Sequence, residues 1–312
     1  MDTSFPKVSV LMLTRNHGAY LQQAIASVQA QSLQAWELLI GEDNSDDNTA
    51  AIAHKAAAAD SRIRVFSSPD GPLGFHHNFN RLLEASLAPY VAFLEGDDWW
   101  SDPHKLELQL ELLDQDPSLT FCGGRTLVVD QRLAPGPHAH SIGPPPGSLR
   151  LALADLISAY SFHFSSVLMR RDALQLPDWI FHQYCLDRPL YLLAALRGDA
   201  AVLDQPVSVY RLHQGGVWAP LSPLQRAHRS RSLFGAFRRH FPRRYRRLFQ
   251  LTLSHILWSY LADAIAQRRR WESLAIVLMG VEAAPGLRLL RQPRPTVSSL
   301  WRVLRPMPIG VT

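Results

Sequence analysis

Short apolar runs alternate with segments of helical periodicity through the first third of the chain. The apolar runs are Val8–Thr14, Trp36–Ile40, Ile63–Phe66 and Tyr90–Leu94. Between them, apolar residues recur every three or four positions, as in Tyr20–Gln31 and Phe75–Ala85, which is typical of amphipathic helices. Strands that alternate with helices predict an α/β fold with a mainly parallel central sheet flanked by helices.

The pattern becomes less regular after the fourth strand. Further predicted elements are a helix over Lys105–Leu113, extended segments over Leu119–Val129 and Ser161–Met169, and a helix over Asp187–Arg197. Residues 134–147 contain five prolines and predict an irregular loop between two halves of one domain. We therefore expect one α/β domain over residues 1–220 and an Arg-rich helical region over 221–312.

Polar residues gather where three of the predicted strands end. Thr14–Asn16 end the first strand, Glu42–Asp43 the second and Glu95–Asp98 the fourth. The carboxyl ends of parallel strands meet at one edge, where open α/β sheets bind ligands. Crowded carboxylates repel one another, and Mg²⁺ or Mn²⁺ prefers such oxygen ligands. The sequence predicts a cation site at this edge; a solvated acidic turn is the alternative.

Several classes of protein are not supported. The chain has neither a Gly-x-Gly-x-x-Gly turn nor a Gly-Lys-Ser/Thr loop, which argues against a dinucleotide-binding fold and a P-loop nucleotidase. Cys122 and Cys185 match no metal or redox spacing and predict buried thiols in a reducing compartment. No signal peptide opens the chain, and Leu248–Ala262 is too short and polar to span a bilayer. We expect a cytoplasmic protein, with peripheral attachment at the inner face of the cell membrane as the alternative.

The net charge of +5 combines an acidic part and a basic part. Residues 1–204 carry 14 Lys and Arg against 24 Asp and Glu, whereas residues 205–262 carry 10 Arg and no acid. A basic helix with interleaved aromatic residues suits an anionic membrane surface or a polyprenyl diphosphate; packing on the acidic domain is the alternative. No nucleic-acid-binding motif accompanies the charge, so no nucleic-acid partner is expected.

The order and spacing of these motifs resemble the inverting, bacterial-type family 2 glycosyltransferases of the GT-A fold. The resemblance covers about residues 7–218 and rests on Thr14-Arg15-Asn16, Glu42 to Thr49, Glu95-Gly96-Asp97-Asp98, Asp102-Pro103, Asp187 and Tyr210 to His213. Three motifs depart from the family pattern. This chain has Glu42-Asp43 where the family has two aspartates, and Glu95-Gly96-Asp97 where the family has Asp-x-Asp. It has Leu186-Asp187 where the family has Glu-Asp.

The resemblance implies a role for each matching residue. Asp187 corresponds to the general base, with a helix-dipole contact as the alternative. The implied nucleotide-sugar-binding residues are Thr14, Asn16, Asp43, Asp97 and Arg211. The implied metal-binding residues are Asp98, Asp97 and His213. For Asp43 the alternative is helix capping, and for His213 it is a structural role.

These residues predict a metal-dependent inverting glycosyltransferase with a divalent cofactor, Mn²⁺ or Mg²⁺. It would move a sugar from a nucleotide diphosphate donor, a UDP-sugar, to a hydroxyl of a glycan or polyprenyl-linked acceptor in bacterial envelope polysaccharide synthesis. The excess of 29 Arg over 3 Lys suggests a GC-rich bacterial genome. The alternatives are a nucleotidyltransferase acting on sugar phosphates and a non-catalytic anionic-surface binding module with a degenerate transferase domain.

Overall fold

The computed structural model describes residues 5–130, 141–159, 162–213 and 221–283. The chain divides into two compact units, unit 1 (Met1–Gln214) and unit 2 (Gly215–Thr312). Each unit is described by itself below. Most of the predicted Arg-rich region is described, and its residues 284–312 lie outside the described part.

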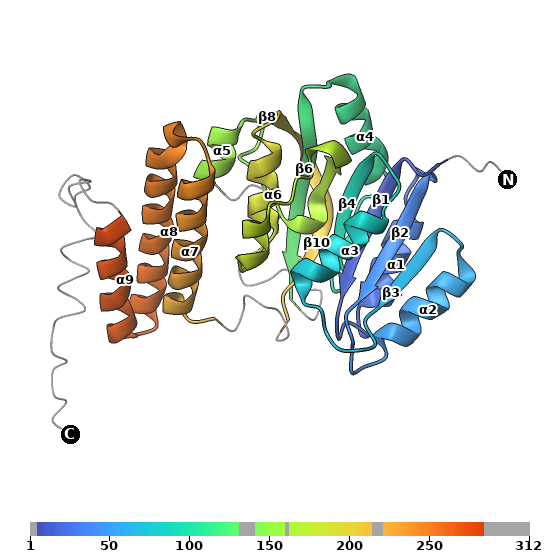
Figure 1. The fold of residues 1–312 in the computed structure, drawn as a ribbon, viewed down its shortest axis with the longest axis horizontal. Coiled ribbons are helices and arrows are strands. Elements are labelled where there is room, and N and C mark those ends of the chain that lie inside the picture. Colours follow the sequence, from blue (N-terminus) through green and yellow to red (C-terminus); the bar gives the residue numbers. More distant parts are fainter. Residues whose placement is uncertain (1–4, 131–140, 160–161, 214–220, 284–312) are drawn as a thin grey trace. The chain divides into compact units, whose positions relative to one another are not determined.

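Unit 1 is a sheet covered by helices, as Figure 1 shows. The strands are β1 (Val8–Thr14), β2 (Trp36–Glu42), β3 (Ile63–Ser67), β4 (Tyr90–Glu95), β5 (Trp99–Trp100), β6 (Leu119–Val129), β7 (Ser141–Ile142), β8 (Arg150–Leu151), β9 (Val167–Arg170) and β10 (Asp199–Arg211). The α-helices are α1 (Leu21–Gln29), α2 (Thr49–Ala59), α3 (Phe75–Ala85), α4 (Lys105–Gln115), α5 (Leu153–Ser158) and α6 (Asp187–Ala194). Within the described residues, the strand order is β3-β2-β1-β4-β9-β6-β10-β5.

The strands β3, β2, β1 and β4 form the parallel part predicted from the sequence. Every residue of β1 and β2 is buried, so the apolar runs lie within the core and not at an edge. The register pairs Thr14 with Glu42 and Leu13 with Glu95. The three predicted polar clusters therefore begin at one level of one sheet edge.

The remaining part of the sheet is mixed. Strand β9 runs antiparallel to both β4 and β6, while β6 and β10 are parallel. A strand was predicted over Ser161–Met169; Ser161 lies outside the described residues, and the described part of the segment forms its strand only from Val167. Before that, Phe164–Ser166 is a 3-10 turn, η1. The prediction was wrong there because polar groups inside the turn bond to distant residues, described below.

A lysine lies inside the core behind the polar edge. The Lys105 side chain is fully buried, its Nζ donates to Gln109 Oε1 at 2.7 Å, and Nζ lies 4.3 Å from the Trp100 ring centre. Burial lowers the pKa of Lys105 to about 7, because the low-dielectric core disfavours the ammonium form.

We expect the stability of the protein to rise with pH because of Lys105. Between pH 7 and the unfolded value near 10.5, the unfolded chain binds more protons than the folded one, so the free energy of unfolding increases with pH. The rise from pH 7 to 9 is about 2 kcal/mol. Urea unfolding of the wild type and of Lys105→Met at both pH values measures it, and the variant should lack this increment. An equal rise in both proteins would contradict the prediction.

The comparison should stop at pH 9. Burial raises the pKa of Cys122 to about 12, so above pH 9 the unfolded chain loses this proton first, and the cysteine's contribution to stability falls with pH and offsets the rise due to Lys105. Because Cys122 is present in both proteins, the difference between the wild type and the variant isolates the lysine.

Unit 2 is helical in its described part, with α7 (Pro223–His240), α8 (Arg246–Ala266) and α9 (Arg270–Ala283). Ser222 caps α7 with a capping box to Gln225, and proline follows at the first helical position, a strong helix start. The buried rings of Phe234, Phe237, Phe241 and Phe249 pack together between α7 and α8. Over the described residues, no helix combines the length and apolar character needed to cross a membrane.

Candidate active site

The loop after β1 carries two of the predicted nucleotide contacts. Thr14 is buried, and its Oγ1 has no hydrogen-bond partner within the described part of the chain. Asn16 has a φ of 56°, a left-handed conformation that asparagine tolerates well. Its N–H donates to Ser45 Oγ at 2.9 Å and its Oδ1 accepts from Asp46 N–H at 2.8 Å. Asn16 joins the loops after β1 and β2, and its contact with a nucleoside stays a prediction.

Asp43, the first residue after β2, is almost completely buried. Its Oδ1 accepts from Leu73 N–H at 2.6 Å and its Oδ2 from Gly74 N–H at 3.0 Å. Asp43 therefore fixes the turn that leads into α3. A carboxylate oxygen can accept a second hydrogen bond, so the predicted role as a partner of the nucleoside base stays open to test.

Gly96 brings the loop after β4 against β1. Its N–H donates to Leu13 O at 2.9 Å. A Cβ at this position would lie 2.5 Å from Thr14 Oγ1 and 3.0 Å from His17 Nδ1, closer than nonbonded atoms can approach. Only glycine lets the carboxylates on either side of it reach the edge.

Gly96→Ala should destabilise the protein by about 1–3 kcal/mol, the usual cost of overpacking a well-packed site. The free energy of unfolding in urea measures this. Gly235→Ala is the matched control, because a Cβ there would have only an ordinary contact, 3.6 Å from Arg239 Nη1. Equal stability of Gly96→Ala and the wild type would show that the loop can move away from Thr14.

Asp97 lies beside two histidines. Its Oδ2 is 2.9 Å from His213 Nε2 and 3.6 Å from His17 Nε2. Burial raises the pKa of Asp97, but the hydrogen bond with His213 and the charges of both histidines outweigh burial and hold the pKa below its usual value. The structure thus brings together two of the three predicted metal ligands, Asp97 and His213. His17 joins them and was missed by the sequence analysis.

Asp98 points into the protein and is 1% exposed. Its Oδ1 accepts from Arg211 N–H at 3.1 Å and its Oδ2 from Ser165 Oγ at 2.7 Å. Burial, together with the charge of Asp97, raises the pKa of Asp98 well above its usual value. Asp98 is therefore a buried carboxylate held by Arg211 and Ser165, close enough to Asp97 for their charges to interact.

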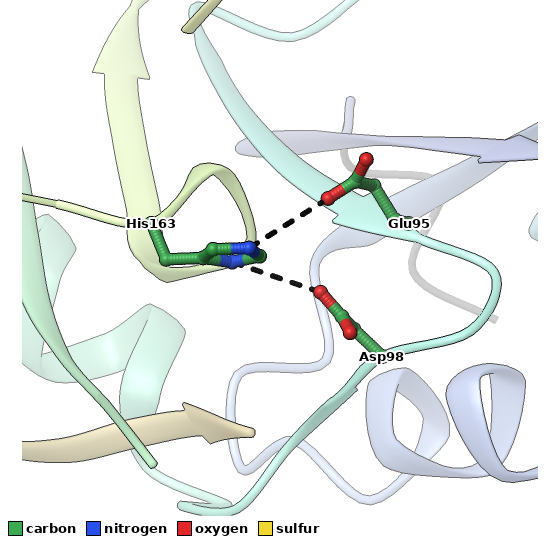
Figure 2. A group of neighbouring side chains, drawn as sticks. All are labelled: Glu95, Asp98 and His163. Carbon is green, nitrogen blue, oxygen red and sulfur yellow. Dashed lines mark ion pairs between the residues drawn. The ribbon is translucent and has the colours of Figure 1, made fainter. Parts of the chain in front are cut away.

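Glu95, Asp98 and His163 form a second group of possible metal ligands (Figure 2). One ligand atom from each of them lies within 4.8 Å of the other two. His163 Nδ1 is 3.6 Å from Asp98 Oδ2, and His163 Nε2 is 4.0 Å from Glu95 Oε2. Burial and then the charges of Asp98, Asp97 and Asp187 raise the pKa of Glu95, and burial lowers that of His163 to about 4. His163 is neutral at pH 7, so nothing cationic in this group offsets the two carboxylates.

Three long-range hydrogen bonds fix η1, which His163 precedes. Trp100 Nε1 donates to Ser165 O at 2.8 Å, Gln109 Nε2 donates to Ser166 O at 2.8 Å, and Ser165 Oγ donates to Asp98. His163 was not predicted as a site residue. The only sequence signal was a histidine and two serines inside an apolar run.

Arg211 holds the loop of Asp97 and Asp98 from behind. Its Nε donates to Asp97 O at 3.1 Å and its Nη2 to Gln23 Oε1 at 2.7 Å. The guanidinium lies 4.6 Å from the Tyr20 ring centre and 4.7 Å from that of Trp99, both favourable cation–π distances. With 5% of its surface exposed, Arg211 is a support of the loop, and its predicted phosphate contact remains a prediction.

Asp187 is the first residue of α6 and lies close enough to Glu95 for their charges to interact. The negative charge of Asp187 raises the pKa of Glu95. It also raises the pKa of His163, against the larger lowering caused by burial. Behind it, the buried Tyr191 hydroxyl has no hydrogen-bond partner among the described residues. Burial and the neighbouring Asp187 and Glu95 raise the pKa of Tyr191 well above its usual value. The structure thus places the predicted base at the edge where the strands β1, β2 and β4 end.

The carboxylate and imidazole groups at this edge of the sheet suit a divalent cation. Four carboxylates converge from β4, its following loop and α6, and burial with mutual repulsion raises the pKa of Glu95 and of Asp98. Carboxylate oxygens and neutral imidazole suit Mn²⁺. Asp97 and His213 keep 15% and 9% of their side-chain surfaces exposed, whereas both oxygens of Asp98 accept hydrogen bonds. Asp97 and His213 are thus a pair that a soluble ligand can reach, and Glu95, with 30% of its side-chain surface exposed, is also accessible.

Comparison with known proteins gives one family. Residues 9–176 match the model described as Glycosyl transferase family 2. Uncharacterized proteins of Mycobacterium bovis and Mycobacterium tuberculosis are 29% identical over 212 residues, 68% of this chain and 60% of theirs. The GalNAc(5)-diNAcBac-PP-undecaprenol beta-1,3-glucosyltransferase of Campylobacter jejuni is 33% identical over 93 residues, 30% of each chain. The chain thus spans only about 60% of the length of the mycobacterial relatives.

Solved structures share the fold at low sequence identity. Staphylococcus aureus TarS 1–349 in complex with UDP-GlcNAc superposes with a TM-score of 0.66 at 16% identity, covering 89% of this chain and 82% of the TarS 1–349 chain. The mannosyltransferase PcManGT of Pyrobaculum calidifontis, solved with GDP-Man and Mn²⁺, gives 0.61 at 17% identity, covering 90% and 81%. The fold is the mixed α/β GT-A fold that the sequence predicted.

Proposed function

Because the chain belongs to glycosyl transferase family 2, we propose that unit 1 transfers a sugar from a nucleotide diphosphate donor to a hydroxyl group with inversion at the anomeric carbon. The observation that carries this proposal is the meeting of Asp187 with Glu95 and Asp97 at one sheet edge. A base and a diphosphate-binding region are the two parts that such a displacement needs.

Asp187 would act as the general base. The acceptor hydroxyl loses its proton as its oxygen attacks the anomeric carbon, and a carboxylate at the start of α6 can take that proton. The bond from the anomeric carbon to the diphosphate breaks in the same step. One displacement on the face opposite the leaving group inverts the configuration.

The residues that would hold a divalent cation are Asp97 and His213. When bound, the cation neutralises negative charge that develops on the departing diphosphate. Asp98 would hold the loop of Asp97 in position through Arg211 and Ser165. This assignment departs from the sequence prediction only for Asp98. Support comes from the similar mannosyltransferase, which was solved with Mn²⁺.

The donor is proposed to be a UDP-sugar and the acceptor a glycan or polyprenyl-linked glycan of the bacterial envelope. Support comes from two similar proteins: TarS was solved with UDP-GlcNAc, and the Campylobacter jejuni relative is named for a diphosphate-linked polyprenol. Thr14, Asn16 and Asp43 would surround the nucleoside.

Calorimetric titration with UDP, GDP and inorganic diphosphate, each with and without Mn²⁺, tests donor binding. We expect UDP to bind most tightly and to need Mn²⁺. Donor hydrolysis then tests the reaction type, because a transferase releases a nucleoside diphosphate whereas a nucleotidyltransferase exchanges diphosphate. Release of inorganic diphosphate, or no binding of any nucleotide, would contradict the proposal.

A further inference from the structure

Arginine side chains surround an open hollow between α7 and α8. The hollow has a volume of about 440 Å³ and is lined by His228, Arg231, Arg238 and Arg239 around Gly235, with Leu253 of α8. A second hollow of about 390 Å³ shares Gly235, Arg238 and Arg239 and adds Arg246. Both therefore adjoin the same glycine.

Acidic residues are scarce along the two helices that line the hollow. Residues 205–262 contain no acid. The acidic side chains described in unit 2 are Asp263, near the other end of α8, and Glu272, which pairs with Arg269. Seventeen residues of helix separate Arg246 from Asp263, about 25 Å. Asp263 therefore lies well beyond the screening length of about 10 Å from Arg246.

The helix dipole of α7 offsets only part of the charge. Arg238, Arg239 and His240 lie in its last turn, where a helix presents about half a negative charge. Arg246 Nε donates to Arg238 O at 3.3 Å. Arg238 Nε, however, is buried without a hydrogen-bond partner among the described residues. A buried guanidinium nitrogen without a partner is costly, and an anion would supply one.

Gly235 keeps the hollow open. It stands in the middle of α7, where glycine is unfavourable compared with alanine. A Cβ would meet only Arg239 Nη1 at 3.6 Å, so close packing does not require glycine here. A longer side chain at this position would project between the arginines.

We propose that this hollow binds the phosphate group of an anionic membrane lipid. Guanidinium groups bind phosphate oxygens with paired hydrogen bonds, and arginines from two helices can contact one phosphate from different sides. Arg243, Arg244 and Arg247 lie on the connection and the start of α8, at the same end of the helix pair. Such a basic rim favours a planar anionic surface. The inference does not depend on the proposed transfer chemistry.

Flotation of the full chain with phosphatidylcholine vesicles, with and without phosphatidylglycerol, tests this. We expect binding only to the anionic vesicles. Arg238→Gln/Arg239→Gln should weaken it roughly 20-fold, because each arginine near an anionic surface contributes about a fivefold factor. Arg243→Gln/Arg244→Gln removes the same charge outside the hollow and should have the smaller effect. An equal loss of vesicle binding in both variants would show that the overall basic charge, and not the hollow, binds the lipid, and it would overturn the proposed site.

Two further variants exclude misfolding as the cause. Gly235→Glu places a carboxylate in the hollow and should abolish binding, whereas Gly235→Ala should retain it. Circular dichroism checks that both stay helical. Titration with inorganic diphosphate separates the sources of phosphate. Binding of diphosphate without binding to anionic vesicles would overturn the lipid assignment, as would vesicle binding by Gly235→Glu equal to that of the wild type.

Discussion

Asp187→Asn should stop sugar transfer while leaving donor binding nearly unchanged. A general base typically contributes a factor of about 10²–10⁴ to the rate, and asparagine keeps the shape of aspartate but cannot take the proton. Asp187 lies at the start of α6, near the carboxylates of β4 and its loop. Turnover with a UDP-sugar and calorimetric binding of UDP with Mn²⁺ measure the two effects separately.

Asp155→Asn is a matched control for this variant. Asp155 is also an acid in the first turn of a helix, α5, and its carboxylate accepts from Ala152 N–H. If Asp187 only interacts with the helix dipole, both variants should lose a little stability and neither should lose turnover. Wild-type turnover in Asp187→Asn would end its assignment as the base.

His213→Ala should weaken Mn²⁺ binding by about tenfold to a hundredfold or more. Loss of a residue that only orients a metal ligand typically costs that much, and His213 is proposed as a ligand itself. His213 Nε2 lies 2.9 Å from Asp97 Oδ2. Loss of His213 therefore removes one proposed metal ligand and also the group that orients the second, Asp97. Titration of Mn²⁺ in the presence of UDP, followed by electron paramagnetic resonance of the free ion, measures the affinity without any turnover.

His163→Asn is the matched comparison, because His163 belongs to the second group of possible ligands, with Glu95 and Asp98. If the cation binds at Asp97 and His213, this variant should change Mn²⁺ affinity much less than His213→Ala. A larger loss of Mn²⁺ affinity in His163→Asn than in His213→Ala would assign the cation to the group in Figure 2 instead. Thermal unfolding of both variants shows whether either loses its fold.

The arrangement at the sheet edge could be predicted from local sequence. The apolar runs of β1, β2 and β4 are buried on both faces, so their length and composition predicted parallel strands. In such a sheet, Thr14, Asp43 and Asp97 must follow strand ends at one edge. Only the order of residues along the chain is needed for that conclusion.

The different environments of the neighbouring carboxylates Asp97 and Asp98 could not be predicted from the local sequence. Asp97 and Asp98 are adjacent in sequence, yet one is partly exposed beside histidines and the other is buried. The difference depends on Ser165 and Arg211, which lie 67 and 113 residues away from Asp98. Hydrogen bonds between such distant residues leave no periodic signal.

The sequence by itself determined the α/β architecture, the polar edge and the separation of acidic and basic parts, because burial patterns and charge are properties of neighbouring residues. The tertiary structure alone decided that His163 meets Glu95 and Asp98, that Arg211 supports the loop behind Asp97, and that arginines of α7 and α8 line the second hollow beside Gly235. Each of these depends on how elements far apart in the chain pack, since only packing brings their side chains within contact distance.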